Sequence, residues 1–131
     1  QKPQQLTIPG AREACDRALG EAGIGLDAVS FAEIYDCFTI SCLMQIEDLG
    51  FCEKGEAGSF IREKGIGIDG TFPLNTHGGL LAHSYLLGVE HVVEAVRQLR
   101  GEGGSAQVEN AEVGLVAGLS VPDYGVLLLG R

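Results

Sequence analysis

The stretch NTHGGLLAHSYLLG, residues 75–88, places several side chains that can exchange protons close together in the sequence. His77, His83 and Tyr85 fall within nine residues of one another. Imidazole and phenol groups both serve as general acids or bases in enzymes. No common catalytic motif contains this set, so the stretch indicates a ligand-binding turn that leads into a helix, without naming the reaction.

The glycines and histidines of this region leave alternatives open. Gly78 and Gly79 would allow the backbone to approach a ligand closely, or would only serve a tight turn. His77 is either a substrate contact or a turn residue. A metal site shared by His77 and His83 is not expected because a turn separates them, and we expect His91 on the exposed face of a helix.

The cysteines give little support for metal or disulfide chemistry. No two of them form a C-x-x-C pair, which argues against structural zinc, and the sequence shows no secretory context for disulfides. We expect free and mostly buried thiols, and a packing role for Cys37. The four cysteines are Cys15, Cys37, Cys42 and Cys52.

Charge and length limit the class of protein. The chain has 131 residues, and its formal net charge of −9 argues against nucleic acid as a partner, although a local pocket could still hold an anionic small molecule. No apolar run reaches the roughly 18 residues that a membrane span needs. We therefore expect one soluble, cytoplasmic domain.

Apolar spacing and turn residues predict the elements of the first half. Glu47 and Asp48 are expected on a solvated helix face. The predicted elements are a helix over residues 9–22, a strand over 30–36, a helix over 38–49 that stops at Gly50, and a long loop over 53–73 with one helical turn at 59–63.

The second half is predicted to contain one helix and two strands. Alternation of helices with strands indicates an α/β layer structure with crossovers. Three strands make a thin sheet, and the chain begins on a helix, so we expect a fragment of a larger protein. The predicted elements are a turn over residues 75–79, a helix over 84–99, a flexible connection over 101–107, and an antiparallel pair of buried strands over 111–119 and 124–129, joined by a turn with Pro122 and Asp123.

Two segments together carry a family resemblance. They are YDCFTISCLMQIEDLGFCEKGEAGSF, from Tyr35, and NTHGGLLAHSYLLGVEHVVEAVRQLRG, from Asn75. From about Pro9 to Arg131, the chain resembles the C-terminal part of thiolase-superfamily enzymes, in the lipid-transfer, sterol-carrier-type branch. The resemblance implies that residues 1–131 form the C-terminal half of a thiolase-like α/β fold, with helices layered on a mixed sheet.

The departures from the family pattern point to a different reaction. The branch usually begins the first motif with His-Asp-Cys/Ala-Phe, where this chain has Tyr35. It usually follows Asn-x-x-Gly-Gly with Gly-His-Pro, and Tyr85 stands at that histidine. Residues 117–121 read AGLSV where thiolases offer Cys-x-Gly or His-Asn-x-Gly-Gly. The two replacements resemble the aldolase-type members, which cleave a β-hydroxyacyl-CoA, such as a steroid side-chain CoA ester, by a retro-aldol reaction.

This resemblance implies roles for the residues of both motifs. Tyr35 and Tyr85 would be the catalytic acid and base, in an order that the sequence leaves open, and a phenol acting as base needs a lowered pKa. The thioester oxyanion would be held by N–H groups of residues 76–79 or by His77. Substrate contacts are expected from Asn75, His77, Gly78 and Gly79. Core packing remains the alternative role for each tyrosine.

Two other functions stay open. One is a thiolase-type acyltransferase, which would need a nucleophilic cysteine upstream. The other is a non-catalytic subunit that binds lipid or acyl-CoA. For the aldolase, the resemblance implies a homodimer and a small OB-fold partner protein that carries a zinc ribbon. CoA would be part of the substrate, with no other cofactor and no metal.

Overall fold

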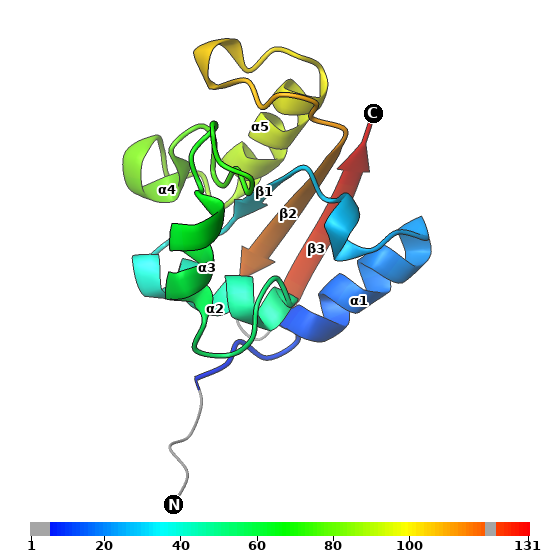
Figure 1. Ribbon diagram of the computed structural model, residues 1–131, viewed down its shortest axis with the longest axis vertical. Helices are drawn as coiled ribbons and strands as arrows, with labels where there is room; N and C mark the ends of the chain where they lie inside the picture. The colour runs from blue at the N-terminus through cyan, green and yellow to red at the C-terminus, as the bar shows by residue number, and fades with distance from the viewer. Residues whose placement is uncertain (1–5, 120–122) are drawn as a thin grey trace, which may run out of the picture.

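A three-stranded mixed sheet forms the centre of the molecule. The computed structural model describes residues 6–119 and 123–131. The strands are β1 (Phe31–Ile34), β2 (Val113–Leu119) and β3 (Tyr124–Gly130), in the spatial order β1-β2-β3 (Figure 1). β1 is parallel to β2, and β2 is antiparallel to β3. The predicted α/β class and the antiparallel strand pair are confirmed.

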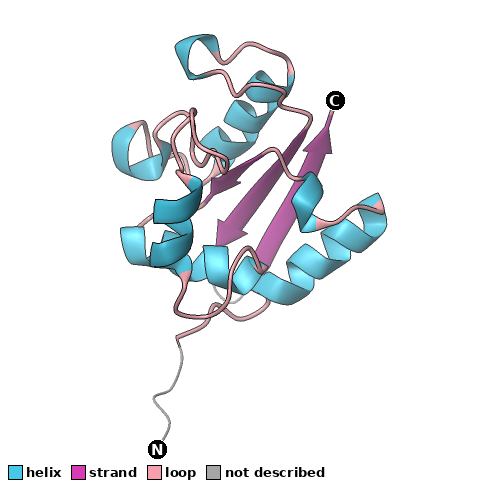
Figure 2. Cartoon of the chain, in the orientation of Figure 1, coloured by secondary structure: helices cyan, strands magenta, loops and turns pink. Residues whose placement is uncertain are grey.

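Helices cover both faces of this sheet. α1 packs on β3 and on α2, whereas α5 packs on all three strands. Figure 2 shows that loops make up much of the chain between α3 and α5. The helices are α1 (Ala11–Ala22), α2 (Thr39–Leu49), α3 (Ala57–Lys64), α4 (Gly79–Ala82) and α5 (Val89–Leu99), with short 3₁₀ turns η1 (Leu26–Ala28) and η2 (Gly104–Ala106).

The two-residue period of β1 divides the core between the two faces. Ala32 and Ile34 pack with residues of α1 and α2, and Phe31 packs on the other side with Ala95 and Leu99 of α5. All four residues of β1 are buried, including Glu33. A carboxylate therefore points into the layer between β1 and α5, where it requires polar partners.

α5 meets this requirement by burying its polar side, contrary to expectation. His91 was expected on the exposed face of the helix, but it is 1% exposed, whereas the apolar Val93 is 53% exposed. The buried side of α5 also carries Glu90, Glu94 and Gln98. The prediction failed because hydrophobic spacing does not register a buried polar partner such as Glu33.

The boundaries of three predicted elements also change. The helix expected from residue 84 begins at Val89, because Leu87 (φ 56°) and Gly88 (φ 92°) adopt left-handed backbone conformations. The expected single turn at residues 59–63 is the eight-residue helix α3. The connection over residues 101–107 contains η2 and is held to α5, since Gln98 donates to the Ala106 carbonyl at 2.8 Å.

The strand pair is less buried than expected. β3 alternates between half-buried and exposed residues, which is typical of a strand at the edge of a sheet, whereas Leu115, Val116 and Ala117 of β2 are buried. The turn predicted between the two strands, at residues 120–122, lies outside the described residues.

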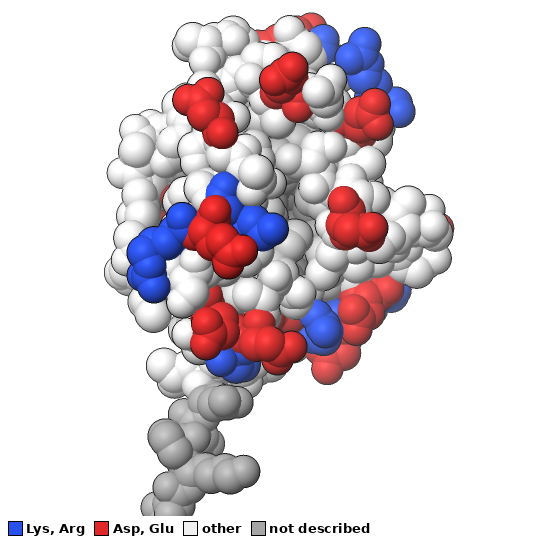
Figure 3. All heavy atoms as spheres, viewed as in Figure 1, with Lys and Arg blue, Asp and Glu red and all other residues white. Residues whose placement is uncertain are grey.

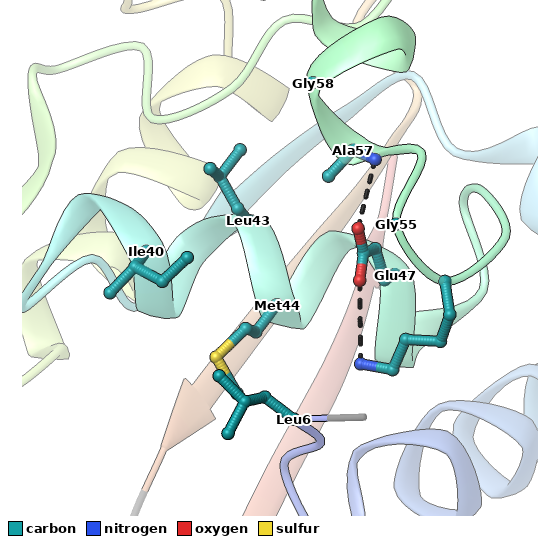
Figure 4. A pocket seen from close by; sticks show the side chains of 9 residues that line it. Leu6, Ile40, Leu43, Met44, Glu47, Gly55, Ala57 and Gly58 are labelled. Atoms are coloured by element: carbon teal, nitrogen blue, oxygen red, sulfur yellow. Dashed lines mark hydrogen bonds and ion pairs between the residues drawn. The ribbon is translucent and has the colours of Figure 1, made fainter. Parts of the chain in front are cut away.

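Glu47 and Asp48 do not lie on a freely solvated face. Glu47 accepts a hydrogen bond from the Ala57 N–H at 3.1 Å (Figure 4), and Lys54 lies beside the carboxylates of Glu47 and Asp48. Asp48 accepts from the N–H of Ile8 at 2.7 Å. The contacts of Glu47 and Asp48 hold α3 and the N-terminal segment against α2. A cavity of about 390 Å³ lies between these parts of the chain.

Charge is dispersed over the visible surface. On the face that Figure 3 shows, Lys and Arg lie among Asp and Glu and do not gather into one continuous basic area. Within the described residues, no helix has the length and apolar character needed to cross a bilayer.

Substitution within α2 tests the assignment of the core. Ile46 is fully buried, whereas Ile40 on the same helix is 57% exposed. We expect Ile46→Ala to lower the free energy of unfolding by about 2–5 kcal/mol, because it leaves a cavity. Ile40→Ala should change it by about 0.5 kcal/mol or less. Chemical denaturation of the full-length protein measures both values, and equal losses would contradict this core.

Candidate functional site

Two tyrosines that are far apart in the sequence meet at the end of β1. The hydroxyl oxygens of Tyr35 and Tyr85 lie 2.7 Å apart, within hydrogen-bond distance. The rings meet edge to face, with centroids 6.4 Å apart and an interplanar angle of 72°. Tyr35 is half-buried, and Tyr85 is 56% exposed. Tyr35 is thus the more enclosed tyrosine of the pair, and Tyr85 is the one that solvent or a ligand can reach.

The hydrogen bond between the two phenols changes the acidity of Tyr35. The hydrogen bond to Tyr85 raises the pKa of Tyr35 to about 12, and burial and the nearby Glu90 carboxylate act in the same direction. The sequence had suggested that a basic phenol would need a lowered pKa, and Tyr35 shows the opposite. Tyr35 therefore stays protonated at neutral pH, and either hydroxyl can be the donor of the hydrogen bond.

The position of Tyr35 is set by backbone contacts at the end of the strand. Its N–H donates to the Ala117 carbonyl of β2 at 2.9 Å, and its carbonyl accepts from Nε2 of Gln45 at 2.6 Å. A β-carbon on Gly88 would come within 3.2 Å of the Tyr35 ring. A glycine at residue 88 therefore allows the loop of Tyr85 to pass close to this ring.

His91 and Asp36 join the same strand end to the neighbouring elements. Nε2 of His91 lies 3.0 Å from the Ile34 carbonyl and 3.3 Å from Oδ1 of Asp36, and the His91 ring stacks on Tyr35. Asp36 also accepts from the Leu80 N–H at 2.8 Å. A β-carbon on Gly79 would collide with the Asp36 carboxylate, so the second glycine of the motif serves this approach.

Asn75 uses its side-chain amide to pair with β1. Its Oδ1 accepts from the Ile34 N–H at 2.7 Å, and its Nδ2 donates to the Ile34 carbonyl at 2.9 Å. The amide thus replaces the backbone of an adjacent strand. This contact fixes the start of the turn at residues 75–79 against the end of the sheet.

His77 lies inside the turn, beside a buried carboxylate. Its side chain is 5% exposed, and its Nδ1 lies 3.1 Å from Oε2 of Glu33. By geometry this contact is not a hydrogen bond, and it is an ion pair only when His77 is protonated. Burial opposes protonation of His77, but the contact with Glu33 and the charges of Glu94 and Asp36 outweigh it and raise the pKa of His77.

The carboxylates near His77 belong to a buried polar network. The Thr76 hydroxyl lies 2.8 Å from Oε1 of Glu33 and 2.7 Å from Oε1 of Glu94. Nε2 of Gln98 donates to Glu94 at 2.9 Å. This network holds the turn of residues 75–79 between β1 and α5.

The remaining histidine does not complete a metal site. His83 is exposed, and its Nδ1 lies 2.8 Å from the Ser84 hydroxyl. The centroids of the His77 and His83 rings lie 5.2 Å apart. Nevertheless, the part of the chain that the structure describes contains no group of three or more His, Cys, Asp or Glu side chains arranged around a metal position.

A mainly apolar cavity of about 370 Å³ adjoins the turn. Its polar side is formed by Asp36, Asn75 and Gly78. Leucine and isoleucine side chains and Cys42 cover much of the rest. An extended apolar group could lie here with a polar end toward the turn.

The structure therefore brings together most of the predicted site residues. Tyr35 and Tyr85 touch, and the turn that carries His77, Gly78 and Gly79 is fixed to the same strand end. Sequence reasoning missed the supporting residues. Asp36, next to Tyr35, was a visible signal, whereas Glu90 lies in the first turn of a helix only because α5 begins at Val89 and not at residue 84. The missed residues are Glu33, Asp36, Glu90, His91, Glu94 and Gln98.

The chain is similar to characterised thiolase-like proteins. It is 42% identical over 108 residues to 17-hydroxy-3-oxo-4-pregnene-20-carboxyl-CoA lyase of Mycobacterium tuberculosis, a match that covers 82% of this chain and 28% of that protein. It is 44% identical over 112 residues to acetyl-CoA acetyltransferase of Methanothermobacter thermautotrophicus, a match that covers 83% of this chain and 28% of that protein.

A solved structure agrees in fold. The Ltp2-ChsH2(DUF35) aldolase superposes with a TM-score of 0.89 at 34% identity, over 98% of this chain and 34% of that one. The chain thus spans about a third or less of the length of these relatives. The model of the family described as thiolase C-terminal domain-like matches residues 1–125. Together with the fold and the motifs at the end of β1, this match shows that the chain belongs to the thiolase C-terminal domain-like family.

Proposed function

We propose that the whole protein is a thiolase-superfamily acyl-CoA retro-aldolase, a carbon–carbon lyase that cleaves a β-hydroxyacyl-CoA to a ketone and a shorter acyl-CoA. The observation that carries the proposal is the 2.7 Å contact between the Tyr35 and Tyr85 hydroxyls. These residues stand where the resembled branch keeps its histidines, and the lyase from Mycobacterium tuberculosis is 42% identical. A steroid side-chain CoA ester is the substrate class that this similarity favours.

In the proposed first step, Tyr85 is the base. It is the exposed member of the pair, so it is the phenol that a substrate can reach. Its phenolate takes the proton of the substrate β-hydroxyl, while Tyr35, whose pKa is about 12, remains protonated and donates to the Tyr85 oxygen. This hydrogen bond stabilises the negative charge that Tyr85 carries before the transfer.

Cleavage then needs no acyl-enzyme. As the hydroxyl loses its proton, the β-carbon becomes a carbonyl carbon, and the electrons of the Cα–Cβ bond pass into the thioester as an enolate. The enolate carbon takes back the proton from Tyr85, which restores the phenolate. The protein must stabilise the enolate oxygen, and backbone N–H groups are suited to this task.

The turn at residues 76–79 offers two such donors. The N–H groups of Thr76 and Gly78 are already engaged, by Glu33 and by the Asn75 carbonyl. Those of His77 and Gly79 have no recorded acceptor within the described residues. We assign them as the oxyanion contacts, with the positive charge of protonated His77 supporting them from the side of Glu33.

The apolar cavity beside the turn suits the acyl part of the substrate. Leu43, Leu74 and Leu81 line it together with the polar groups of the turn. An acyl chain or ring system bound there would leave its thioester near residues 77–79. Cofactor chemistry is not required, since CoA enters as part of the substrate.

An acyltransferase is the second candidate, favoured by the 44% identity to an acetyl-CoA acetyltransferase. Such an enzyme would need a thiolate nucleophile. In this chain, burial and the charge of Asp36 raise the pKa of Cys42 to about 12, and burial also raises the pKa of Cys15 and Cys52. These three thiols are therefore poor nucleophiles, so an acyltransferase would have to take its nucleophilic cysteine from upstream, and reading that part of the protein separates the two candidates.

The proposed assembly follows the similar complex. The structural neighbour pairs an aldolase with a DUF35 protein. We propose a homodimer in the cytoplasm that binds a small OB-fold partner carrying a zinc ribbon.

The proposed roles predict the effect of removing either hydroxyl. In the full-length enzyme with its partner, Tyr85→Phe and Tyr35→Phe should each lower kcat by about 10²–10⁴, because each removes a group that transfers or stabilises a proton. Chromatographic detection of the ketone and the shorter acyl-CoA measures the rate.

The third tyrosine supplies a matched control. Tyr124 donates its hydroxyl to Gln45 at 2.8 Å, on the side of α2. Tyr124→Phe should lower the melting temperature but keep turnover per folded molecule within about twofold, since it removes a structural hydrogen bond only. Near-normal cleavage by Tyr85→Phe would refute the proposed function.

The charge of His77 gives a pH-dependent prediction. Because the pKa of His77 is raised on folding, its stabilisation is fully present below its unfolded value, about 6.5, and is lost as pH rises through the folded value. His77→Gln should therefore reduce the free energy of unfolding more at pH 6 than at pH 9. Urea denaturation of the full-length protein at both values measures the difference.

The exposed His83 is the control for this measurement. His83→Gln should reduce stability by a similar small amount at both pH values. A loss in His77→Gln that does not depend on pH would contradict a charged His77.

A further inference from the structure

We propose that Glu90 is a positioning residue, whose carboxylate folds the loop before α5 so that the Tyr85 hydroxyl lies against Tyr35. This inference rests on the proposed function of the tyrosine pair. Oε1 of Glu90 accepts from the Leu86 N–H at 2.8 Å, and Oε2 accepts from the Gly88 N–H at 3.0 Å. Both oxygens of one carboxylate thus bind the backbone directly after Tyr85.

The loop needs such a support because its conformation is unusual. Leu87 has φ 56° and Gly88 has φ 92°, and a left-handed conformation is unfavourable for leucine. The side chains of Leu86 and Leu87 are 61% and 74% exposed, so packing within this chain does little to hold them. The carboxylate contacts compensate for this cost from the inner side of the loop.

Tyr85 has few other contacts that would fix its position. Its side chain is 56% exposed, and the hydrogen bond recorded for its hydroxyl within the described residues is the one with Tyr35. Tyr35, in contrast, is anchored by β2, by α2 and by the His91 ring. The relative placement of the two phenols therefore depends on the loop that carries Tyr85.

The ionised form of Glu90 is the one that fits. Glu90 is 5% exposed. Burial opposes ionisation, but the N–H groups of Leu86 and Gly88, its own N–H and the charge of His91 outweigh it and lower the pKa of Glu90. A glutamine at this position would keep the shape but present an NH₂ group to one of the two N–H donors, so one contact would become repulsive.

The test uses Glu90→Gln in the full-length enzyme. It should lower kcat by about 10- to 100-fold with a much smaller change in KM, because a misplaced catalytic group slows the chemical step more than binding. Glu13→Gln is the matched control, because Glu13 is also an acidic residue in the first turn of a helix but is exposed. The turnover of the Glu13→Gln enzyme should stay normal.

Titration of Tyr35 separates positioning from a general loss of structure. Tyrosine labelled with ¹³C at Cζ reports each phenol by NMR, and Tyr35→Phe assigns its signal. In Glu90→Gln the pKa of Tyr35 should fall from about 12 toward its ordinary value of about 10, because the contact with Tyr85 is lost.

Removing the Glu90 charge would also lower this pKa directly, so the same substitution is made in a Tyr85→Phe background. There the direct effect of the charge remains, but the effect through the hydrogen bond is absent. We expect Glu90→Gln to lower the pKa of Tyr35 clearly less in the Tyr85→Phe background than in the otherwise unchanged enzyme. Equal falls of the Tyr35 pKa in both backgrounds would overturn the proposal, as would an unchanged kcat in Glu90→Gln when Tyr85→Phe has lost its activity.

The test of Glu90 and the test of the proposed retro-aldolase function can fail independently. If Tyr85→Phe were fully active, the retro-aldol assignment would fail, but a larger fall in the intact background would still show that Glu90 holds Tyr85 against Tyr35.

Discussion

The need to satisfy buried carboxylates shapes the region around the end of β1. Glu33 and Asp36 come from the strand and the residues after it, and Glu90 and Glu94 come from α5; all four are buried. A buried carboxylate is tolerated only with hydrogen-bond donors or a cation close by. Here the donors are N–H groups and side chains of the loops at residues 76–88, so burying the acids also orders those loops.

This arrangement places the two tyrosines by different means. Tyr35 follows a strand whose backbone is paired on both sides, which gives it a rigid position. Tyr85 stands on a short irregular loop and meets the rigid part of the site through its hydroxyl and through the edge-to-face contact of its ring with Tyr35. A site made of one fixed and one loop-borne group can admit a bulky substrate from the loop side while the fixed group keeps its orientation.

Prediction from sequence succeeded where one kind of signal dominates. Apolar spacing with Gly23 and Gly50 as stops predicted α1 and α2, and β-branched runs predicted the strand pair. Family motifs pointed to Tyr35 and Tyr85 as an acid and a base, which composition could not have done, and the structure adds that their hydroxyls lie 2.7 Å apart. The orientation of α5 was missed because apolar spacing does not register polar partners: Glu94 binds Thr76, which lies 18 residues away in the sequence.

The side chain of Asn75 has a consequence for assembly. By pairing with both backbone groups of Ile34, it occupies the open edge of β1 as a strand one residue long. The adjacent bridge between Ala32 and Leu74 covers the rest of that edge. Unpaired edges are the places where sheets recruit further strands, including those of other molecules. A further strand is therefore blocked directly beside β1, whereas β3 pairs with β2 on one side only among the described residues.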